Sequence, residues 1–271
     1  MLIAQLTDLH IKESGKLAYR KVDTVASLKN AINHLNTLVP RPDQVIITGD
    51  LGDFGTPDEY ALICELLADL TLPYSVIPGN HDCRTNMREA FSGKASFDHP
   101  EYCHFIQSAG DYQLIGLDTS VAGKPYGFLE NESLVWLEQQ LSKHVDSPTL
   151  LFLHHPPMAV GLSHMDVQNL KNADELKAVL KQHPQVKGIV AGHLHRPISA
   201  TWADIPVWVG PSHSHSVTLD LDPEAPSSFS MEPPAIRLFT LGEDTIVSHL
   251  SYIKDSEGPY PFFDENNQLI D

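Results

Sequence analysis

Five short stretches of this sequence carry more acidic, imidazole and amide side chains than a turn requires. A turn after a strand needs residues such as glycine or asparagine, but it needs neither an imidazole nor a carboxylate beside them. Each stretch follows a short apolar run that is typical of a β-strand. The five stretches are LTDLH (6–10), TGDLGD (48–53), PGNHD (78–82), FLHHPP (152–157) and AGHLH (191–195).

Metal binding is the chemistry that these residue types suit. The carboxyl ends of the strands in an open α/β sheet share one edge, so the five stretches can converge on one crevice. Asp8 and His10 are two residues apart, as are His193 and His195, and the two-residue period of a strand puts both members of a pair on one face. The donors that this predicts are Asp8, His10, Asp50, Asn80, His154, His193 and His195.

Seven oxygen and nitrogen donors without cysteine are more than one ion needs, and they suit Mn, Fe, Co or Zn. We therefore expect two metal ions that share a bridging carboxylate, for which Asp50 is the candidate. Asp8, His10 and His195 would complete the shell of one ion. Asn80, His154 and His193 would complete the other shell, and because Asn80 is a neutral ligand, that ion is expected to bind less tightly.

Each stretch also has an ordinary structural explanation when it is taken alone. Asp-x-His can be a turn cap beside a hydrogen-bonded histidine, Gly-Asp is a common turn, and the prolines of HHPP mark a loop. All five stretches in one chain, each behind a strand, favour the shared site.

The elements expected to position these residues alternate between strand and helix, which predicts βαβ units and an α/β fold. Strands are expected at LIAQLT, QVIIT, YSVIP, YQLIGLD, TLLFLHH and VKGIVAGH. Helices are expected over about 22–38, 57–69, 84–91, 131–144 and 172–182. After His195 the pattern predicts consecutive strands, ISATW, IPVWVG, SVTLDL, AIRLFTL and TIVSHL, with DPEAPSSFSMEPP as an exposed loop.

Net charge and cysteine content limit the classes of binding partner and the cellular compartment that we expect. The formal net charge of −17 argues against a surface that neutralises nucleic-acid phosphates or anionic lipid. The three cysteines, Cys64, Cys83 and Cys103, form no CxxC pair and predict neither a disulfide framework nor a thiolate zinc site. The first residues resemble no signal peptide, and no apolar run is long enough for a membrane span. We expect a cytoplasmic protein that binds neither a nucleic acid polymer nor a membrane.

The set D-x-H, G-D, G-N-H-D, H-x-P and G-H-x-H resembles the signature of the calcineurin-like metallophosphoesterases over residues 1 to about 220. Within that superfamily the chain most resembles class III cyclic nucleotide phosphodiesterases, and particularly the bacterial glycerophosphodiesterases. The phrase GPYPFFDEN is similar to their C-terminal segment. The resemblance implies a four-layer αββα sandwich with a small C-terminal cap or tail: a catalytic domain over 1–250 and a tail over 251–271. The tail, with Tyr260, Phe262 and Phe263, would cover the site or an oligomer interface, and the resemblance implies a dimer or higher homo-oligomer.

The same resemblance places the family's metal ligands on the seven donors named above. The H-x-P spacing selects His154 over His155. Related diesterases have a histidine that contacts substrate about twenty residues after G-H-x-H, which selects His215 and keeps His213 as the alternative.

The residues beside the ligands have candidate roles of their own. His81 is expected at the rim of the site, where it can donate to a phosphoryl oxygen or protonate the leaving alkoxide. Asp82 either orients that imidazole or caps the helix that begins near residue 84. Arg196 either meets the phosphate or is an exposed side chain without a role. Asp53 is expected to support the ligands or the turn, and Cys83 to be structural.

These residues together predict a phosphodiesterase with two metal ions, which hydrolyses small phosphodiesters by attack of a metal-bound hydroxide. A glycerophosphodiester and a 3′,5′-cyclic nucleotide both fit. A site with few fixed cations besides its metals suits the single charge of a diester better than the charge of a monoester. The alternatives are a phosphomonoesterase of the same fold and a non-catalytic scaffold.

Overall fold

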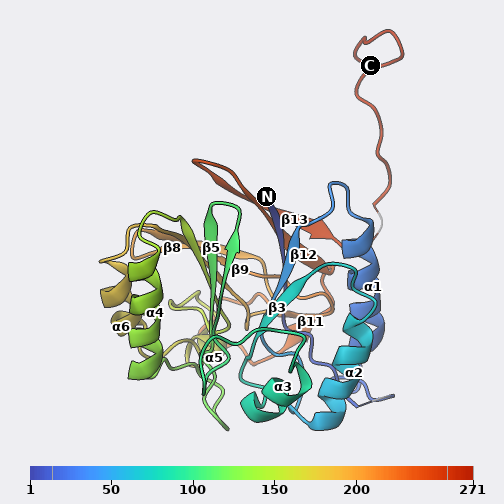
Figure 1. Cartoon of the computed structure of the whole chain (residues 1–271). Helices are drawn as coiled ribbons and strands as arrows, with labels where there is room; N and C mark the ends of the chain where they lie inside the picture. The colour runs from blue at the N-terminus through green and yellow to red at the C-terminus, as the bar shows by residue number, and fades with distance from the viewer. Residues whose placement is uncertain (14, 255, 271) are drawn as a thin grey trace.

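The strands form two sheets that lie face to face, with helices on the outer side of each (Figure 1). The computed structural model describes residues 1–13, 15–254 and 256–270. Sheet one has the strand order β13-β12-β1-β2-β3. Its strands are β1 (Leu2–Leu6), β2 (Gln44–Thr48), β3 (Tyr74–Ile77), β12 (Ala235–Leu241) and β13 (Ile246–Tyr252). The first three run parallel, and β12 lies antiparallel to β1.

Sheet two has the strand order β4-β5-β6-β7-β9-β8. Its strands are β4 (Phe105–Ala109), β5 (Tyr112–Leu117), β6 (Thr149–Leu153), β7 (Val186–Ala191), β8 (Ile198–Trp202) and β9 (Ile205–Val209). The run from β5 through β6 and β7 to β9 is parallel, and the two edge strands are antiparallel. A separate two-stranded ribbon joins β10 (Ser216–Val217) to β11 (Phe229–Ser230).

Two of the helices begin at residues whose side chains cap them. Asp23 accepts a hydrogen bond from the Ala26 amide and so caps α1 (Thr24–Thr37), and Thr56 and Glu59 form a capping box at the start of α2 (Pro57–Leu67). The remaining helices are α3 (Arg84–Ala90), α4 (Asn131–Lys143), α5 (Ser163–Asp166) and α6 (Ala173–Leu180). Within the described residues, no helix is both long and apolar enough to cross a bilayer.

Three apolar layers hold these elements together. One packs the buried side chains of α1 and α2 against sheet one, and a second packs α4 and α6 against sheet two. The third lies between the sheets, where Ile46 and Phe239 of sheet one meet Leu114 and Phe152 of sheet two. This arrangement confirms the predicted four-layer αββα sandwich.

The chain continues to pair after the parallel strands of sheet one have ended. The amides of Asp8 and His10 donate to the carbonyl oxygens of Gly49 and Asp50, at 3.0 and 2.9 Å. On the other sheet, the Gly192 amide donates to the His154 carbonyl at 3.0 Å. Main-chain hydrogen bonds thus tie the polar loops to one another at the carboxyl edge.

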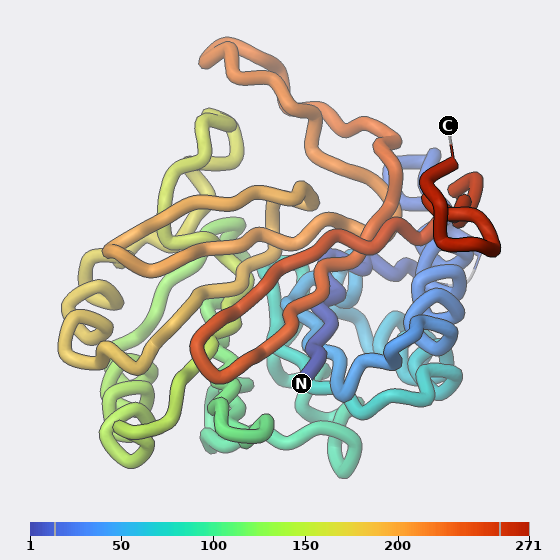
Figure 2. Tube along the Cα trace, turned by 90° about the horizontal axis from the view of Figure 1, so that it is seen from above, coloured from blue at the N-terminus to red at the C-terminus, as the bar shows by residue number. Residues whose placement is uncertain are grey.

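The sequence predicts most elements to within a few residues but misses β4, α5 and β11. Only two residues of the expected strand SVTLDL pair in a sheet. The loop that follows is exposed, as predicted, and it projects from the body as the orange segment of Figure 2.

The C-terminal segment leaves the body after β13. Residues 256–270 are exposed and extend away from the sandwich (Figure 1). A bridge between Phe263 and Leu269 folds the end of the segment back on itself. The division into a domain over 1–250 and a tail over 251–271 stays a prediction, and the last strand runs two residues past that boundary.

Removing an aromatic ring from the layer between the sheets should destabilise the protein strongly. Phe239 is fully buried there and packs against the ring of Trp208. We expect Phe239→Ala to lower the free energy of unfolding by about 3–5 kcal/mol. Val145→Ala is the surface control, because this side chain is 57% exposed and lies outside the tail, and we expect a change within about 0.5 kcal/mol. Urea denaturation followed by circular dichroism measures both, and similar losses would contradict the assigned layers.

Candidate metal centre

The loops after five parallel strands bring the seven predicted donors into one buried crevice. Asp8 and His10 follow β1, Asp50 follows β2, and Asn80 follows β3. His154 follows β6, and His193 and His195 follow β7. Six of the seven side chains are fully or almost fully buried, and Asn80 is partly buried.

One group of donors joins the first and last of these loops. The Nε2 atoms of His10 and His195 lie 3.1 Å apart, and Asp8 Oδ1 lies 3.4 Å from His195 Nε2. The three side chains are placed so that one cation could contact all of them. They form the first of the two ligand groups predicted from the sequence.

Asp50 lies between this group and the second. Its Oδ2 atom is 3.7 Å from His10 Nε2 and 3.3 Å from His154 Nε2. Its Oδ1 atom accepts a hydrogen bond of 2.9 Å from the His81 amide. The carboxylate is therefore fixed in the position that a bridging ligand needs.

The outer nitrogens of the histidines determine which atom faces the crevice. His154 Nδ1 lies 2.8 Å from the Thr48 carbonyl oxygen, and His195 Nδ1 lies 3.3 Å from the His215 carbonyl oxygen. A carbonyl can only accept, so each Nδ1 carries a hydrogen, and each Nε2 offers a lone pair to the crevice when the ring is uncharged. Carbonyl and carboxylate partners of this kind are typical of metal-binding histidines.

His10 has a carboxylate partner in the same place. Its Nδ1 atom lies 3.3 Å from Asp53 Oδ1, and Lys12 forms an ion pair with the other oxygen of Asp53. With Nδ1–H donating to Asp53, the lone pair of His10 Nε2 points at the lone pair of His195 Nε2. Two lone pairs 3.1 Å apart repel each other unless a proton or a cation lies between them.

Burial keeps several of these groups in the uncharged form that metal binding requires of histidine. It lowers the pKa of His193 and His195 well below the ordinary value. Burial also raises the pKa of Asp8 to about 6. Burial acts on His154 as well, but the Asp50 carboxylate outweighs it and raises the pKa of His154 to about 9.

Other donor atoms in the crevice are unsatisfied. Asp8 Oδ2, Asn80 Oδ1 and His193 Nε2 are buried and have no hydrogen-bond partner among the described residues. Buried polar atoms are rarely left unpaired, and each exception calls for an explanation. Together with the facing lone pairs, these three atoms show that the donor set fits two metal ions.

Glycine precedes three of the ligands because the loops approach too closely for a side chain. A Cβ atom on Gly79 would lie 2.1 Å from Asp50 Oδ1, and one on Gly49 would lie 2.4 Å from His154 Nδ1. Neither position could carry alanine without displacing a donor. The glycines of the G-D and G-N-H-D stretches thus allow the loops to converge.

The backbone at the predicted ligands is strained. Five of the seven have φ angles in the left-handed region, which L residues rarely adopt. These are Asp8 (55°), His10 (46°), Asp50 (51°), His193 (72°) and His195 (53°). Such strain is concentrated at functional sites, where the surrounding structure holds it in place.

A cavity of about 450 Å³ opens onto the donors. His81 and His215 lie in its wall, whereas His213 does not. Tyr19 and Phe229 add aromatic surface, with ring centroids 5.3 and 5.5 Å from that of His215. The sequence gives no signal for Tyr19 and Phe229, because both lie outside the five polar stretches.

His81 is held by the chain that carries Asp53. Its Nδ1 atom lies 2.8 Å from the Asp53 carbonyl oxygen, so Nδ1–H donates there and Nε2 is left for the cavity. Asp53 therefore supports two imidazoles, that of His81 through its carbonyl and that of His10 through its carboxylate.

Asp82 has neither of the roles predicted for it. Its carboxylate accepts hydrogen bonds from the amides of Leu51, Gly52 and Gly79 and from the Tyr60 hydroxyl. It therefore ties its own loop to the loop after β2. Its oxygens are occupied by these donors instead of by His81, and Cys83 is the residue that precedes α3, without a side-chain cap.

Arg196 also departs from the prediction. Its Nη1 atom donates to the Val217 carbonyl at 2.7 Å and to Glu232 at 2.6 Å. The guanidinium holds the β10–β11 ribbon and is absent from the wall of the 450 Å³ cavity, so it is not placed to meet a phosphate. His155 is buried behind the ligands, where Nδ1 lies 2.8 Å from Thr119 Oγ1.

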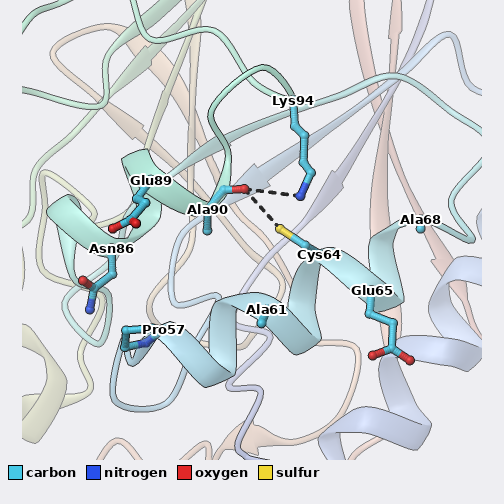
Figure 3. Close-up of a pocket in the computed structure, with 9 residues that line it drawn as sticks. All are labelled: Pro57, Ala61, Cys64, Glu65, Ala68, Asn86, Glu89, Ala90 and Lys94. Atoms are coloured by element: carbon cyan, nitrogen blue, oxygen red, sulfur yellow. Dashed lines mark hydrogen bonds between the residues drawn. The ribbon is translucent and has the colours of Figure 1, made fainter.

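A larger hollow of about 730 Å³ lies between α2 and α3, away from the donors (Figure 3). Cys64 Sγ and Lys94 Nζ both donate to the Ala90 carbonyl oxygen at its edge. Its lining residues are Pro57, Ala61, Cys64, Glu65, Ala68, Asn86, Glu89, Ala90 and Lys94. Because none of the predicted ligands lines it, this hollow is not the candidate site.

Comparison with known proteins gives consistent matches. The family model Calcineurin-like phosphoesterase matches residues 1–197. A probable glycerophosphodiester phosphodiesterase of Arcobacter nitrofigilis is 44% identical, with 100% of both chains covered. A 3′,5′-cyclic-nucleotide phosphodiesterase of Nostoc sp. is 32% identical over 83% of this chain and 84% of its own. The fold is shared with a dimetal phosphatase of Danio rerio, at a TM-score of 0.68 and 14% identity, over 94% of this chain and 96% of that chain.

A methyl group at Gly79 should weaken metal binding, because it would displace the Asp50 carboxylate. We expect Gly79→Ala to lower metal affinity by roughly 10–100-fold, the range seen when groups that orient ligands are disturbed. Titration calorimetry of the metal-free protein with Mn²⁺ or Co²⁺ measures this. Gly93→Ala is the control, since a Cβ there meets nothing within 4 Å. Its left-handed backbone should cost about 1–2 kcal/mol of stability without changing metal affinity, and equal affinities in both variants would refute the crowding at Gly79.

Proposed function

Because the chain belongs to the calcineurin-like phosphoesterase family, we propose that it is a metal-dependent phosphodiesterase with a binuclear centre. The observation that carries the proposal is the position of Asp50, whose Oδ2 atom lies between the Nε2 atoms of His10 and His154. A carboxylate there can bridge two ions. We further propose small phosphodiesters as the substrates.

The proposed ligands fall into two sets that share Asp50. Asp8, His10 and His195 would hold the first ion, and Asn80, His154 and His193 would hold the second. The oxygen and nitrogen donors admit Mn, Fe, Co or Zn. When bound, two such ions would lower the pKa of a water molecule and withdraw charge from phosphate oxygens.

His81 is proposed as the group that assists departure of the alcohol. The Asp53 carbonyl fixes its ring through Nδ1, so the protonated imidazole can donate from Nε2 into the cavity. There it can stabilise charge on a phosphoryl oxygen or protonate the leaving oxygen. The chain then needs no serine or cysteine nucleophile.

Substrate binding is proposed for the aromatic part of the cavity wall. The His215 ring lies beside those of Tyr19 and Phe229, and Ser214 Oγ lies 2.9 Å from its Nδ1 atom. Glycerophosphodiesters are the first candidate, supported by the name of the relative from Arcobacter nitrofigilis. Cyclic nucleotides are the second, because the aromatic rings of Tyr19 and Phe229 could stack with a base.

The cellular setting is part of the proposal. Cys64, Cys83 and Cys103 are all free thiols, which supports a reducing compartment, and we propose the cytoplasm. The net charge of −17 supports small substrates over nucleic acid polymers. We also propose a homo-oligomer, supported by the exposed Tyr260, Phe262 and Phe263 of the tail.

Hydrolysis by metal-stripped protein tests the activity. The protein is reloaded with Mn²⁺, Co²⁺ or Zn²⁺ and given a glycerophosphodiester, 3′,5′-cyclic AMP or a simple phosphomonoester. We expect diesters to be cleaved only after metal is added, Asp50→Ala to be inactive, and His81→Ala to lose about 10²–10⁴-fold in kcat.

Arg196→Ala is the control for this experiment, because its guanidinium is committed to Glu232, and we expect a change of less than about tenfold. The ratio of kcat/KM between the two diesters identifies the substrate class. Faster cleavage of the monoester, or no cleavage in any metal, would refute the proposed diesterase.

Sedimentation velocity tests the proposed assembly. We expect the full chain to sediment as a dimer or larger species, and Phe262→Ser with Phe263→Ser to shift it toward monomer. Val39→Ser is the control, since Val39 is a surface residue that is 94% exposed and lies outside the tail. A monomer at all concentrations would overturn the proposed oligomer.

A further inference from the structure

A buried carboxylate follows β5, whose exit supplies none of the proposed ligands. Asp118 has a fully buried side chain and forms an ion pair with Arg84. Arg84 Nε donates to Oδ2 at 2.5 Å, and Nη2 donates to Oδ1 at 3.2 Å. This two-point contact fixes both the position and the plane of the guanidinium.

Asp118 is firmly anchored on its own side of the molecule. Its oxygens also accept from the amides of Cys103 and Ser120, each at 3.0 Å. Its amide donates to His104 Nδ1 at 2.9 Å, and His104 Nε2 lies 2.9 Å from the hydroxyl of Ser133 in α4. The carboxylate is thus a fixed point that belongs to sheet two and its helices.

Arg84 belongs to the part of the chain that follows β3 of sheet one. It is the first residue of α3, directly after the loop that carries Asn80 and His81. The helix has seven residues, which is too short for stability on its own. Helix α3 borders the 730 Å³ hollow on the side that faces α2 (Figure 3), so the packing of α3 against α2 is incomplete. Asp82 holds the loop to sheet one, whereas Arg84 holds it to sheet two.

The residue after Asp118 is linked through His155 to the proposed ligands of sheet two. Thr119 Oγ1 lies 2.8 Å from Nδ1 of the buried His155. The His155 ring centroid lies 4.8 Å from the His154 ring centroid and 4.8 Å from the His193 ring centroid. Asp118 and Thr119 therefore connect two parts of the site. Asp118 contacts Arg84, which follows the loop of Asn80, and Thr119 contacts His155, which packs against His154 and His193.

We infer that Asp118 is a positioning residue, which acts through Arg84 to set the distance between Asn80 and the pair His154 and His193. This inference rests on the ligand sets proposed above. The ion that Asn80 helps to hold needs ligands from both sheets, so its affinity depends on the distance between them. The other ion shares Asp50, which this loop holds through one hydrogen bond from the His81 amide. Its remaining ligands, Asp8, His10 and His195, lie on loops that Arg84 does not contact.

Co²⁺ titration of the metal-free, full-length protein tests the inference, with calorimetry and visible absorption reporting the two binding steps. We expect Arg84→Ala and Asp118→Asn each to weaken one step by roughly 10–100-fold, the range for groups that support ligands. The other step should change by less than about threefold. Hydrogen exchange of residues 78–83 in the metal-free protein should also become faster.

Arg88→Ala is the matched control. Arg88 lies on the same helix, but it donates to the carbonyl oxygens of His99 and Tyr102. We expect it to leave both binding steps unchanged, even if stability falls. Arg84→Lys keeps the charge without the two-point contact, and we expect it to restore only part of the lost affinity.

Asn80→Ala separates failure of this inference from failure of the proposed function. If Asn80→Ala weakens one step but Arg84→Ala and Asp118→Asn do not, the ligand sets stand and the positioning role is wrong. Equal weakening of both steps in Arg84→Ala and Asp118→Asn would show general destabilisation and would also overturn the inference. If Asn80→Ala changes neither step, the proposed second ligand set is itself wrong.

Discussion

The crowding of donor atoms into a dry crevice is the constraint on which this structure depends. The Nε2 atoms of His10 and His195 face each other at 3.1 Å, so a proton or a cation must lie between them, while Asp8 Oδ2 and His193 Nε2 are buried without a partner among the described residues. Burial makes each of these atoms costly to leave unpaired. Cations at this edge would turn every one of these unfavourable contacts into a favourable one, so the crevice is organised for charges that the chain itself does not supply.

Bringing the donors together also requires unusual backbone conformations. The left-handed conformations of Asp8, Asp50 and His193 each cost on the order of 1–3 kcal/mol, and the glycines before Asp50 and His193 let neighbouring loops come close. The three apolar layers of the sandwich offset that cost at a distance from the site. Stability and site geometry are therefore provided by different parts of the molecule, with the polar loops at the edge and the packed side chains between the layers.

Local pattern was sufficient to predict the alternating elements, an α/β fold and a set of donors that the structure brings together, whereas the four layers followed from the family resemblance. The hydrogen-bond partners of individual side chains were not predictable, because they depend on which loops meet. Asp82 and Arg196 lie beside proposed ligands in the sequence. In the structure, however, Asp82 accepts hydrogen bonds from amides of the loop after β2, and Arg196 donates to Glu232. Strand β4 was not predicted because it lies on a sheet edge and carries the polar residues Gln107 and Ser108. Asp118 is the last residue of the expected strand YQLIGLD, and nothing in the neighbouring sequence indicates its contact with Arg84.

The distribution of the donors along the chain has a consequence for synthesis. Asp8 lies near the start and His195 far along the chain, and β1 also pairs with β12 near the other end. At about 5–20 residues per second, roughly 10–40 s separate the appearance of these two donors at the ribosome. Until His193 and His195 have been made, a nascent chain carries five of the seven proposed ligands, and each of the two ligand sets lacks one member. The choice of metal then falls to the finished protein and to the ions around it, and is not made while the chain is being translated.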